Sequence, residues 1–339
     1  MKNEKIKLTL DDGNIVDAQT PLIVSASRAT DIPAFYSEWF FNRLGKGYVR
    51  WRNPYNGKDS YVSFDNTKFI VFWSKNPAPL LPFLPILKQK GIGCYVQYTL
   101  NDYEAEGLEP SVPPLHGRIE TFKRLVDELG LGSVVWRFDP LILTDRISAE
   151  DLLHKISNIA GELRGYVEKL VFSFADISSY RKVGRNLSEA GINYYEWSED
   201  EMVEFSRRLA DMNLGLELAT CAEKVDLSEY GISHNRCIDP ELICRLSPEL
   251  EPLIRNSKTD KGQRKLCGCI ASKDIGTYNT CPHGCAYCYA NTSPVSARQN
   301  YLLHQQNPDN DSIILKDMTA HHFVTWINAL HLLQFYAIK

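Results

Sequence analysis

The sequence predicts an α/β protein built on a partial (βα)6 barrel, a TIM-like arrangement of strand–helix units. Six short apolar segments alternate with segments of helical periodicity between residues 21 and 222. This alternation is typical of a parallel sheet with right-handed crossovers. Polar residues gather where the apolar segments end, at the edge where both barrels and open sheets form their sites. Six units are compatible with partial closure into a barrel and with an open sheet.

The predicted strands are short runs rich in β-branched and aromatic residues. They cover residues 21–27, 69–73, 94–99, 134–139, 170–174 and 214–219. Helices are predicted between them, because apolar residues recur on one face over residues 35–44, 79–89, 115–129, 148–163 and 198–209. Two of these helices begin with capping boxes, formed by Ser148 with Asp151 and by Ser198 with Glu201.

Segments outside the strand–helix units complete the predicted organisation. Residues 1–20 contain a hairpin, and residues 48–64 form a second hairpin inserted into the (βα)6 barrel of residues 21–222. A cysteine-rich segment over residues 223–315 is expected to cross the barrel mouth. Residues 316–339 carry the apolar stripe of a C-terminal helix.

Composition excludes several classes of protein. The 339 residues are 44 % hydrophobic and 24 % charged, which is ordinary for a globular protein. The start is polar, and no apolar run approaches the roughly 20 residues that span a bilayer, so we expect no signal peptide, no membrane span and a cytoplasmic location. The net charge of −4 gives no overall signature of nucleic-acid binding. Nine cysteines, an odd number, argue against a disulfide framework.

Three cysteines near the end of the chain have the spacing C-x3-C-x2-C: Cys281, Cys285 and Cys288. Thiolates on a short loop hold iron–sulfur clusters, and three ligands would leave one iron of a [4Fe–4S] cluster open. Zinc also binds thiolates, so the spacing is compatible with zinc as well. We predict that these three cysteines are metal ligands and that His283, which lies between two of them, is a loop residue.

Four further cysteines predict a second metal site: Cys221, Cys237, Cys267 and Cys269. Four thiolates hold either a second [4Fe–4S] cluster or a structural zinc ion. In the alternative, Cys267 and Cys269 pack beside the first cluster, and Cys221 acts alone as a hydrogen donor to a radical. The remaining two, Cys94 and Cys244, fall in apolar patterns and are predicted to be buried small hydrophobic residues.

Polar residues at the strand ends predict a pocket at the barrel mouth. Arg137 and Asp139 are two residues apart in one strand, so they share a face. We predict that they are catalytic together with Cys221 and Glu223, although Arg137 and Asp139 also fit a structural salt bridge. The residues predicted to contact a cofactor or substrate are Arg28, Asp31, Asn76, Gln97 and Tyr287.

Six dispersed motifs identify a family resemblance. They are Ser27–Pro33, Phe72–Pro77, Val135–Pro140, Thr220–Glu223, Cys237–Asp239 and Cys267–Ala290. Over residues 21–315 the chain resembles the family of domains of unknown function numbered 1848 (DUF1848). Its departures are Ala29, where a second arginine is common, and Ala219 beside Thr220, where a glutamate is often seen.

The resemblance implies a function, because the cysteine cluster of this family is similar to that of radical S-adenosylmethionine (SAM) enzymes. There an aromatic residue, here Tyr287, precedes the third cysteine of a loop whose [4Fe–4S] cluster binds SAM. Such a cluster cleaves SAM reductively to a 5′-deoxyadenosyl radical, which would act on a substrate that the sequence does not identify. The implied fold is the partial barrel of radical SAM type, and the implied partner is an electron donor such as a flavodoxin or ferredoxin.

One departure from ordinary radical SAM enzymes is the position of the loop. They carry it after the first strand, whereas here it follows the sixth unit. The alternative function is an iron–sulfur or zinc protein that serves in electron transfer, binding or structure without SAM chemistry.

Overall fold

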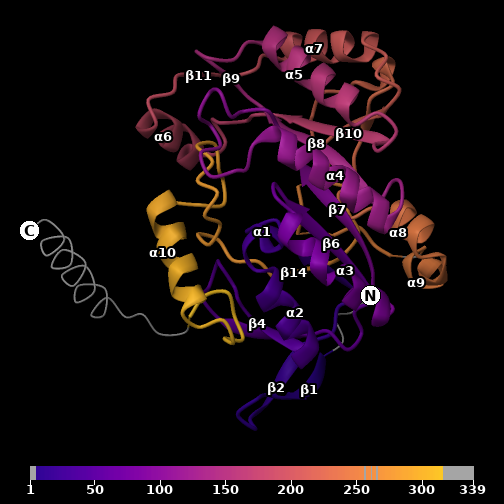
Figure 1. Cartoon of the computed structure of the whole chain (residues 1–339), viewed down its shortest axis with the longest axis vertical. Coiled ribbons are helices and arrows are strands. Elements are labelled where there is room, and N and C mark those ends of the chain that lie inside the picture. Colours follow the sequence, from indigo (N-terminus) through magenta and orange to yellow (C-terminus); the bar gives the residue numbers. More distant parts are fainter. Residues whose placement is uncertain (1–4, 256, 261, 265, 316–339) are drawn as a thin grey trace, which may run out of the picture.

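The computed structural model describes residues 5–255, 257–260, 262–264 and 266–315 (Figure 1). The predicted C-terminal helix over residues 316–339 lies outside the described residues. Figure 1 shows the hairpin of strands β1 (Lys5–Thr9) and β2 (Ile15–Gln19) at the end of the molecule opposite to helix α7 (Glu199–Asp211).

All six predicted strands are present, and they pair in parallel in the order in which they occur along the chain. They are β3 (Ile23–Ala26), β6 (Phe69–Ser74), β7 (Gly93–Thr99), β8 (Val134–Leu141), β10 (Lys169–Phe174) and β12 (Glu217–Thr220). Two short strands that the sequence did not predict extend the edges. β14 (Lys273–Asp274) pairs with β3, and β13 (Ser233–His234) pairs with β12, which makes an eight-stranded sheet.

The strand order decides where the helices lie. Each crossover steps to the next position in the same direction, so right-handed connections place the intervening helices on one face of the sheet. β13 and β14 are the two edges, so the described part of the sheet is open and does not close into a barrel. The predicted α/β class and parallel sheet are therefore confirmed.

The predicted helices are present with some differences in their bounds. α4 (Leu115–Leu129), α5 (Ala149–Glu162) and α7 match the prediction, and the capping boxes of α5 and α7 are formed. The first predicted helix is split into α1 (Ile32–Phe35) and α2 (Ser37–Lys46), and the second into the 3-10 helix η1 (Ala78–Phe83) and α3 (Leu84–Gln89). None of the helices in the described part of the chain could span a membrane.

Both predicted hairpins are confirmed, and they combine into a second sheet. β1 pairs with β2, and β4 (Tyr48–Arg52) pairs with β5 (Asp59–Ser63), both antiparallel. β2 and β5 also pair in parallel, which gives the order β1-β2-β5-β4. The sequence predicted each hairpin but not their union.

Several smaller elements lie between the main strand–helix units or after them. α6 (Arg181–Glu189) lies between β10 and β12, and the short strands β9 (Leu143–Thr144) and β11 (Tyr194–Tyr195) pair with each other. The cysteine-rich segment contains η2 (Ser228–Tyr230), α8 (Pro240–Leu246), η3 (Pro248–Leu250), α9 (Glu251–Ile254) and α10 (Pro294–Gln305).

The two faces of the central sheet pack against different parts of the chain. Side chains alternate along each strand, so neighbouring residues point to opposite faces. Val24 and Phe72 belong to the larger apolar core, which the main helices complete. Ile23 and Val71 belong to a smaller core that is completed by residues between 237 and 270. Part of the cysteine-rich segment therefore covers the face that the crossover helices leave free.

Candidate functional site

The loop that carries the C-x3-C-x2-C cysteines is attached to the sheet through Asp31, just after β3. The Asp31 carboxylate accepts hydrogen bonds from Ser74 Oγ (2.7 Å) and from the backbone N–H of Lys75 (2.8 Å), at the end of β6. It also contacts His283 Nε2 at 2.8 Å, and His283 Nδ1 lies 3.3 Å from the carbonyl oxygen of Ser111. Both ring nitrogens of His283 thus have protein partners, which supports its predicted role as a loop residue.

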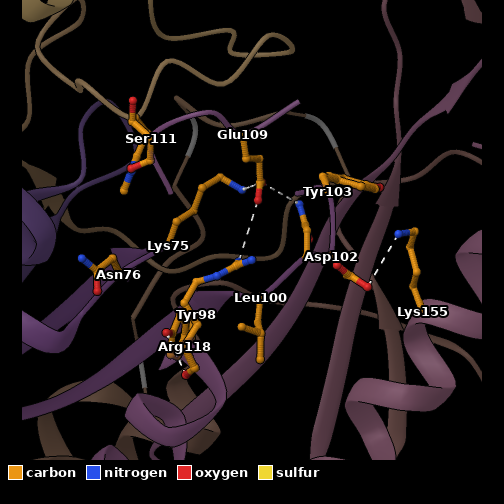
Figure 2. Close-up of polar contacts among 12 residues, drawn as sticks. Lys75, Asn76, Tyr98, Leu100, Asp102, Tyr103, Glu109, Ser111, Arg118 and Lys155 are labelled. Atoms are coloured by element: carbon orange, nitrogen blue, oxygen red, sulfur yellow. Dashed lines mark hydrogen bonds and ion pairs between the residues drawn. The ribbon is translucent and has the colours of Figure 1, made fainter. Parts of the chain in front are cut away.

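A buried network of charged and polar groups supports the same loop. Lys75 Nζ lies 2.7 Å from Glu109 Oε1, and Arg118 Nη1 lies 3.8 Å from Glu109 Oε2. Figure 2 shows Lys75 and Arg118 pointing toward Glu109 from separate parts of the chain. The Tyr287 hydroxyl donates to Glu109 Oε1 and accepts from Lys75 Nζ (2.9 Å) and Asn101 Nδ2 (3.1 Å). Tyr287, a predicted cofactor contact, therefore fixes the loop to the ends of β6 and β7.

The network places one carboxylate between two cations. The Glu109 side chain is 1 % exposed. Burial raises the pKa of its carboxyl, but Lys75 and Arg118 outweigh that effect and hold the pKa below its ordinary value. Burial likewise opposes the charged form of Lys75, yet Glu109 keeps the pKa of its ammonium above the ordinary value. Glu109 is therefore a carboxylate held between two cations.

We call Cys281, Cys285 and Cys288 the cysteine triad. Cys285 is buried, the other two are partly buried, and all three are close enough for their thiols to interact electrostatically. Burial raises the pKa of each thiol, and Lys75 partly offsets this effect at Cys285. The three predicted ligands therefore lie within electrostatic range of one another and near the partly buried ammonium of Lys75.

We call Cys221, Cys237, Cys267 and Cys269 the four-thiol group. The Sγ atoms of Cys221 and Cys237 are 3.6 Å apart. The side chain of Cys269 contacts those of Cys237 and Cys267. Hydrogen bonds with Cys269 lower the pKa of the Cys267 thiol more than burial raises it, so this pKa falls to about 7. The structure thus gathers four cysteines that lie far apart in the sequence.

Neither cysteine set is arranged as a finished metal site. Within the residues that the structure describes, no group of three or more histidine, cysteine, aspartate or glutamate side chains is positioned to hold a metal ion. Cys94 and Cys244, which were predicted to be buried small hydrophobic residues, pack against the two apolar cores but are only partly buried. Both lie apart from the contacts that define the triad and the four-thiol group.

Arg137 and Asp139 form the ion pair that their spacing allowed, on the face of the sheet that carries the four-thiol group. Arg137 Nε lies 3.1 Å from Asp139 Oδ2, and Arg137 Nη1 donates to Gln97 Oε1 (3.2 Å) and to Cys237 Sγ (3.3 Å). Ser173 donates a further hydrogen bond to Asp139. Burial raises the pKa of the Asp139 carboxyl, but Arg137 outweighs it and leaves that pKa below its usual value.

The guanidinium of Arg28 has one nitrogen without a protein partner. It lies over the Trp73 ring at 4.9 Å, and its Nη2 is buried with no hydrogen bond. Its backbone N–H donates to Asp274 Oδ2 (2.9 Å), and its carbonyl accepts from the Tyr289 hydroxyl (2.7 Å). Arg28 also interacts electrostatically with thiols of the four-thiol group, and Tyr289 follows Cys288 of the triad.

Two other predicted site residues take part in hydrogen bonds with the backbone or through their own backbone. Glu223 accepts a hydrogen bond from the backbone N–H of Phe174 (3.1 Å), and burial raises the pKa of its carboxyl to about 7. The backbone N–H of Asn76 donates to Ser74 Oγ (2.9 Å). Asn76 lies next to Lys75 but away from Glu109 in Figure 2.

The sequence did not single out Glu109, Arg118, Asn101 or Asp274. Glu109 lies in the loop between β7 and α4, where no motif marks it. Arg118 belongs to the amphipathic helix α4, whose charged residues are expected at the surface, yet its side chain is 2 % exposed. Lys75 and Arg118 require a nearby carboxylate because both are largely removed from solvent. Only the tertiary structure reveals that they converge on Glu109.

Comparison with known proteins identifies a family but no characterised relative. The family described as "Domain of unknown function (DUF1848)" matches residues 23–290. No curated protein and no solved structure matches the chain. The matched residues extend from β3 through the cysteine triad and include both cysteine sets, so the chain belongs to the DUF1848 family.

Proposed function

We propose that the protein is a radical SAM-like iron–sulfur enzyme whose [4Fe–4S] cluster is held by the cysteine triad. The observation that carries this proposal is that three cysteines with electrostatically interacting thiols lie on one loop, which Asp31 and Tyr287 attach near the carboxyl ends of the parallel strands. The histidine within that loop, His283, has both ring nitrogens in contact with Asp31 and Ser111, so neither is free to bind a metal. Three cysteine ligands leave one iron of such a cluster available to a small molecule.

The surroundings of the triad suit a negatively charged cluster. A cluster with three thiolates brings negative charge into a buried site, and burying charge without a partner is costly. Lys75 interacts with Cys285 and supplies a cation at that point. Glu109 and Tyr287 hold Lys75 in place through contacts of 2.7 Å and 2.9 Å. These residues orient the loop and neutralise its charge.

SAM is the proposed small molecule at the open iron. When bound, a reduced cluster supplies the electron that cleaves SAM to methionine and a 5′-deoxyadenosyl radical. Arg28 fits a role in binding, because its unpartnered Nη2 is buried and a guanidinium pairs well with a carboxylate. Six parallel strands in chain order also fit the proposed partial barrel of radical SAM type. The proposed catalytic residues at the strand ends are Arg137, Asp139 and Glu223, and Cys221 is assigned to the four-thiol group.

The proposed chemistry suggests a cellular location and an electron donor. An oxygen-sensitive cluster and nine free thiols suit a reducing cytoplasm, which is the proposed location. A flavodoxin or ferredoxin is the proposed source of the electron.

Anaerobic reconstitution tests the proposal. Purified protein is supplied with iron and sulfide, and iron content, absorbance near about 400 nm and dithionite-dependent release of 5′-deoxyadenosine from SAM are measured. We expect all three signals, and we expect Cys285→Ala to lose the iron and the activity. Cys94→Ala is the matched control, because this cysteine lies in strand β7 outside both cysteine sets.

The outcomes separate the parts of the proposal. Full iron and sulfide in Cys285→Ala would contradict the ligand assignment. A triad-dependent cluster that releases no 5′-deoxyadenosine would instead support the alternative of electron transfer without SAM chemistry.

A further inference from the structure

The sulfur atoms of the four-thiol group accept hydrogen bonds from several directions. Cys269 Sγ accepts from the backbone N–H groups of Cys237 (3.1 Å) and Ile238 (3.3 Å). Cys237 Sγ accepts from Arg137 Nη1 (3.3 Å) and Asn235 Nδ2 (3.5 Å). A neutral thiol is a weak acceptor, whereas metal-bound thiolates are commonly oriented by such donors. The donors around these two sulfurs are therefore of the kind that orient metal-bound thiolates.

The spacing of the thiols favours a single metal ion. Four sulfurs at the zinc–sulfur bond length of about 2.3 Å stand about 3.8 Å apart at the corners of a tetrahedron. Cys221 Sγ and Cys237 Sγ are 3.6 Å apart, close to that edge. A disulfide would require about 2.05 Å. A cubane cluster places each thiolate on a separate iron corner, which separates the sulfurs more widely than this contact.

The surroundings also match the charge of such a site. One divalent ion with four thiolates carries a net negative charge. Arg137 interacts electrostatically with Cys221 and Cys237 from within the sheet. Arg264 Nη2 lies 3.9 Å from Cys221 Sγ on the other side, and Arg28 interacts with the remaining thiols. Three guanidinium groups therefore surround four sulfurs.

We propose that Cys221, Cys237, Cys267 and Cys269 bind one zinc ion in a structural tetrathiolate site, separate from the cysteine triad. The site would join the end of β12, which carries Cys221, to the segment that covers the free face of the sheet. All four ligands come from the protein, which is typical of structural zinc sites, whereas catalytic sites keep one position open.

The side chains need a small rearrangement to form this site. They contact one another in the order Cys221, Cys237, Cys269, Cys267, as a chain and not yet as a tetrahedron. Cys267 is partly exposed and borders a pocket of about 410 Å³ lined also by Asp260 and Arg264. This pocket gives a metal ion access to the thiols, and rotation of Cys267 closes the chain.

The test uses the full chain without the triad, so its result does not depend on the proposed iron–sulfur chemistry. The protein carrying Cys281→Ser, Cys285→Ser and Cys288→Ser is purified anaerobically, stripped with a chelator and titrated with Zn²⁺ against a chromophoric competitor. We expect about one zinc ion per chain. Cobalt(II) in its place should give the strong visible absorption of a tetrahedral thiolate complex.

A fourth substitution identifies the ligands. Adding Cys237→Ser should weaken zinc binding more than tenfold, because a thiolate ligand is lost. Cys267→Ser should have the same effect, and this partly exposed residue is the second variant in case Cys237→Ser does not fold. Cys244→Ser is the matched control, because this cysteine lies in α8 and takes no part in the sulfur contacts. Circular dichroism checks the fold of each variant.

Three results would overturn the inference. The first is a triad-free protein that binds no zinc, and the second is zinc affinity that survives both Cys237→Ser and Cys267→Ser. The third is assembly of an iron–sulfur cluster on the four-thiol group during reconstitution with iron, sulfide and zinc together.

Discussion

The cysteine triad and the four-thiol group are held against the same sheet but are assembled in different ways. The triad comes from one loop, residues 281–288, and its spacing is visible in the sequence. The four-thiol group draws on three separate regions, around residues 221, 237 and 267–269. A local motif therefore marks the first set, whereas only the chain fold brings the second together.

The two sets also differ in the charges around them. Beside the triad, the Glu109 carboxylate lies between the cations Lys75 and Arg118. Beside the four-thiol group, the Arg137 guanidinium lies between the Asp139 carboxylate and the sulfur of Cys237. Near the triad, two cations share one carboxylate, and Lys75 also interacts with Cys285. Near the four-thiol group, the Arg137 guanidinium has its own carboxylate partner and also donates to a sulfur. On the two proposals above, the sets would bind different metals, and we expect them to respond to different substitutions.

The largest expected effect is on the support of the triad. Glu109→Gln keeps the shape of the side chain but leaves two buried cations without their carboxylate, which should lower the free energy of unfolding by about 3–5 kcal/mol. Urea unfolding under anaerobic conditions measures this loss. Because the neutral amide oxygen of glutamine is a weaker acceptor for the Tyr287 hydroxyl than a carboxylate, iron binding by the triad should also decrease, while zinc binding by the four-thiol group should be unchanged.

Glu204→Gln is the control for Glu109→Gln. Glu204 lies on the exposed face of α7 and pairs with Arg207 at 2.8 Å, so its loss should leave urea unfolding unchanged within error. Equal behaviour of the two variants would show that the network does not support the loop. A simultaneous loss of iron and zinc in Glu109→Gln would show that the two cysteine sets are not independent.

A smaller effect is expected from the strand that lies between the two sets in the sequence. Asp274 in β14 accepts hydrogen bonds from Ser25 Oγ (2.8 Å), the N–H of Arg28 (2.9 Å) and the N–H of Gly276 (2.8 Å). Asp274→Asn turns one acceptor into a donor, so we expect a loss of about 2 kcal/mol in unfolding free energy.

Metal content then distinguishes a shared support from separate ones. β14 follows Cys269 and precedes Cys281, so detaching it from β3 should weaken both iron and zinc binding in Asp274→Asn. Asp211→Asn changes an exposed carboxylate of α7 and serves as the control. Loss of only one metal would mean that β14 positions one cysteine set alone.

Features that depend on neighbouring residues in the sequence were predicted, whereas features that depend on contacts between distant residues were not. The six strands and the capping boxes of α5 and α7 depend on local patterns, and they were predicted. Strands β13 and β14 have two residues each, too few to show alternation, and only pairing with a neighbour defines them. Helix α6 is short, and its apolar face consists of Val183 and Leu187 alone, so the pattern covers too few positions to predict a helix.

The candidate site shows the same division. The triad has a motif, but Glu109 acquires its role only because Lys75 and Arg118 converge on it through the fold. The grouping of the four thiols was inferred by counting the cysteines left over, and the contact between Cys221 and Cys237 supports that grouping. Distances and donors, which decide between zinc and a cluster, are not encoded in any local pattern.

The smallest expected effect concerns the pH dependence of β14. Lys273 Nζ lies over the Trp51 ring, 3.2 Å from its centroid, and burial lowers the pKa of this ammonium to about 8 from its ordinary 10.5. The folded protein therefore binds fewer protons than the unfolded chain between these two values. The free energy of unfolding must therefore increase as the pH rises from about 8 toward 10.5, and it must decrease as the pH falls back toward 8.

Comparing wild-type protein with Lys273→Met isolates this contribution from the thiols that titrate over the same range. From about pH 7.5 to about pH 9, the free energy of unfolding of the wild type should gain about 1 kcal/mol more than that of the variant. Lys123→Met removes a partly exposed lysine of α4 that pairs with Glu120, and it should follow the wild-type curve over this range. Parallel curves for wild type and Lys273→Met would show that burial of this ammonium does not oppose its charge. Lys273 and Asp274 are the two residues of β14, and Lys273 packs on Trp51. If stability rises with pH as expected, the protonation state of Lys273 affects how firmly β14 is attached to β3. The attachment of both cysteine sets to the sheet would then depend on pH.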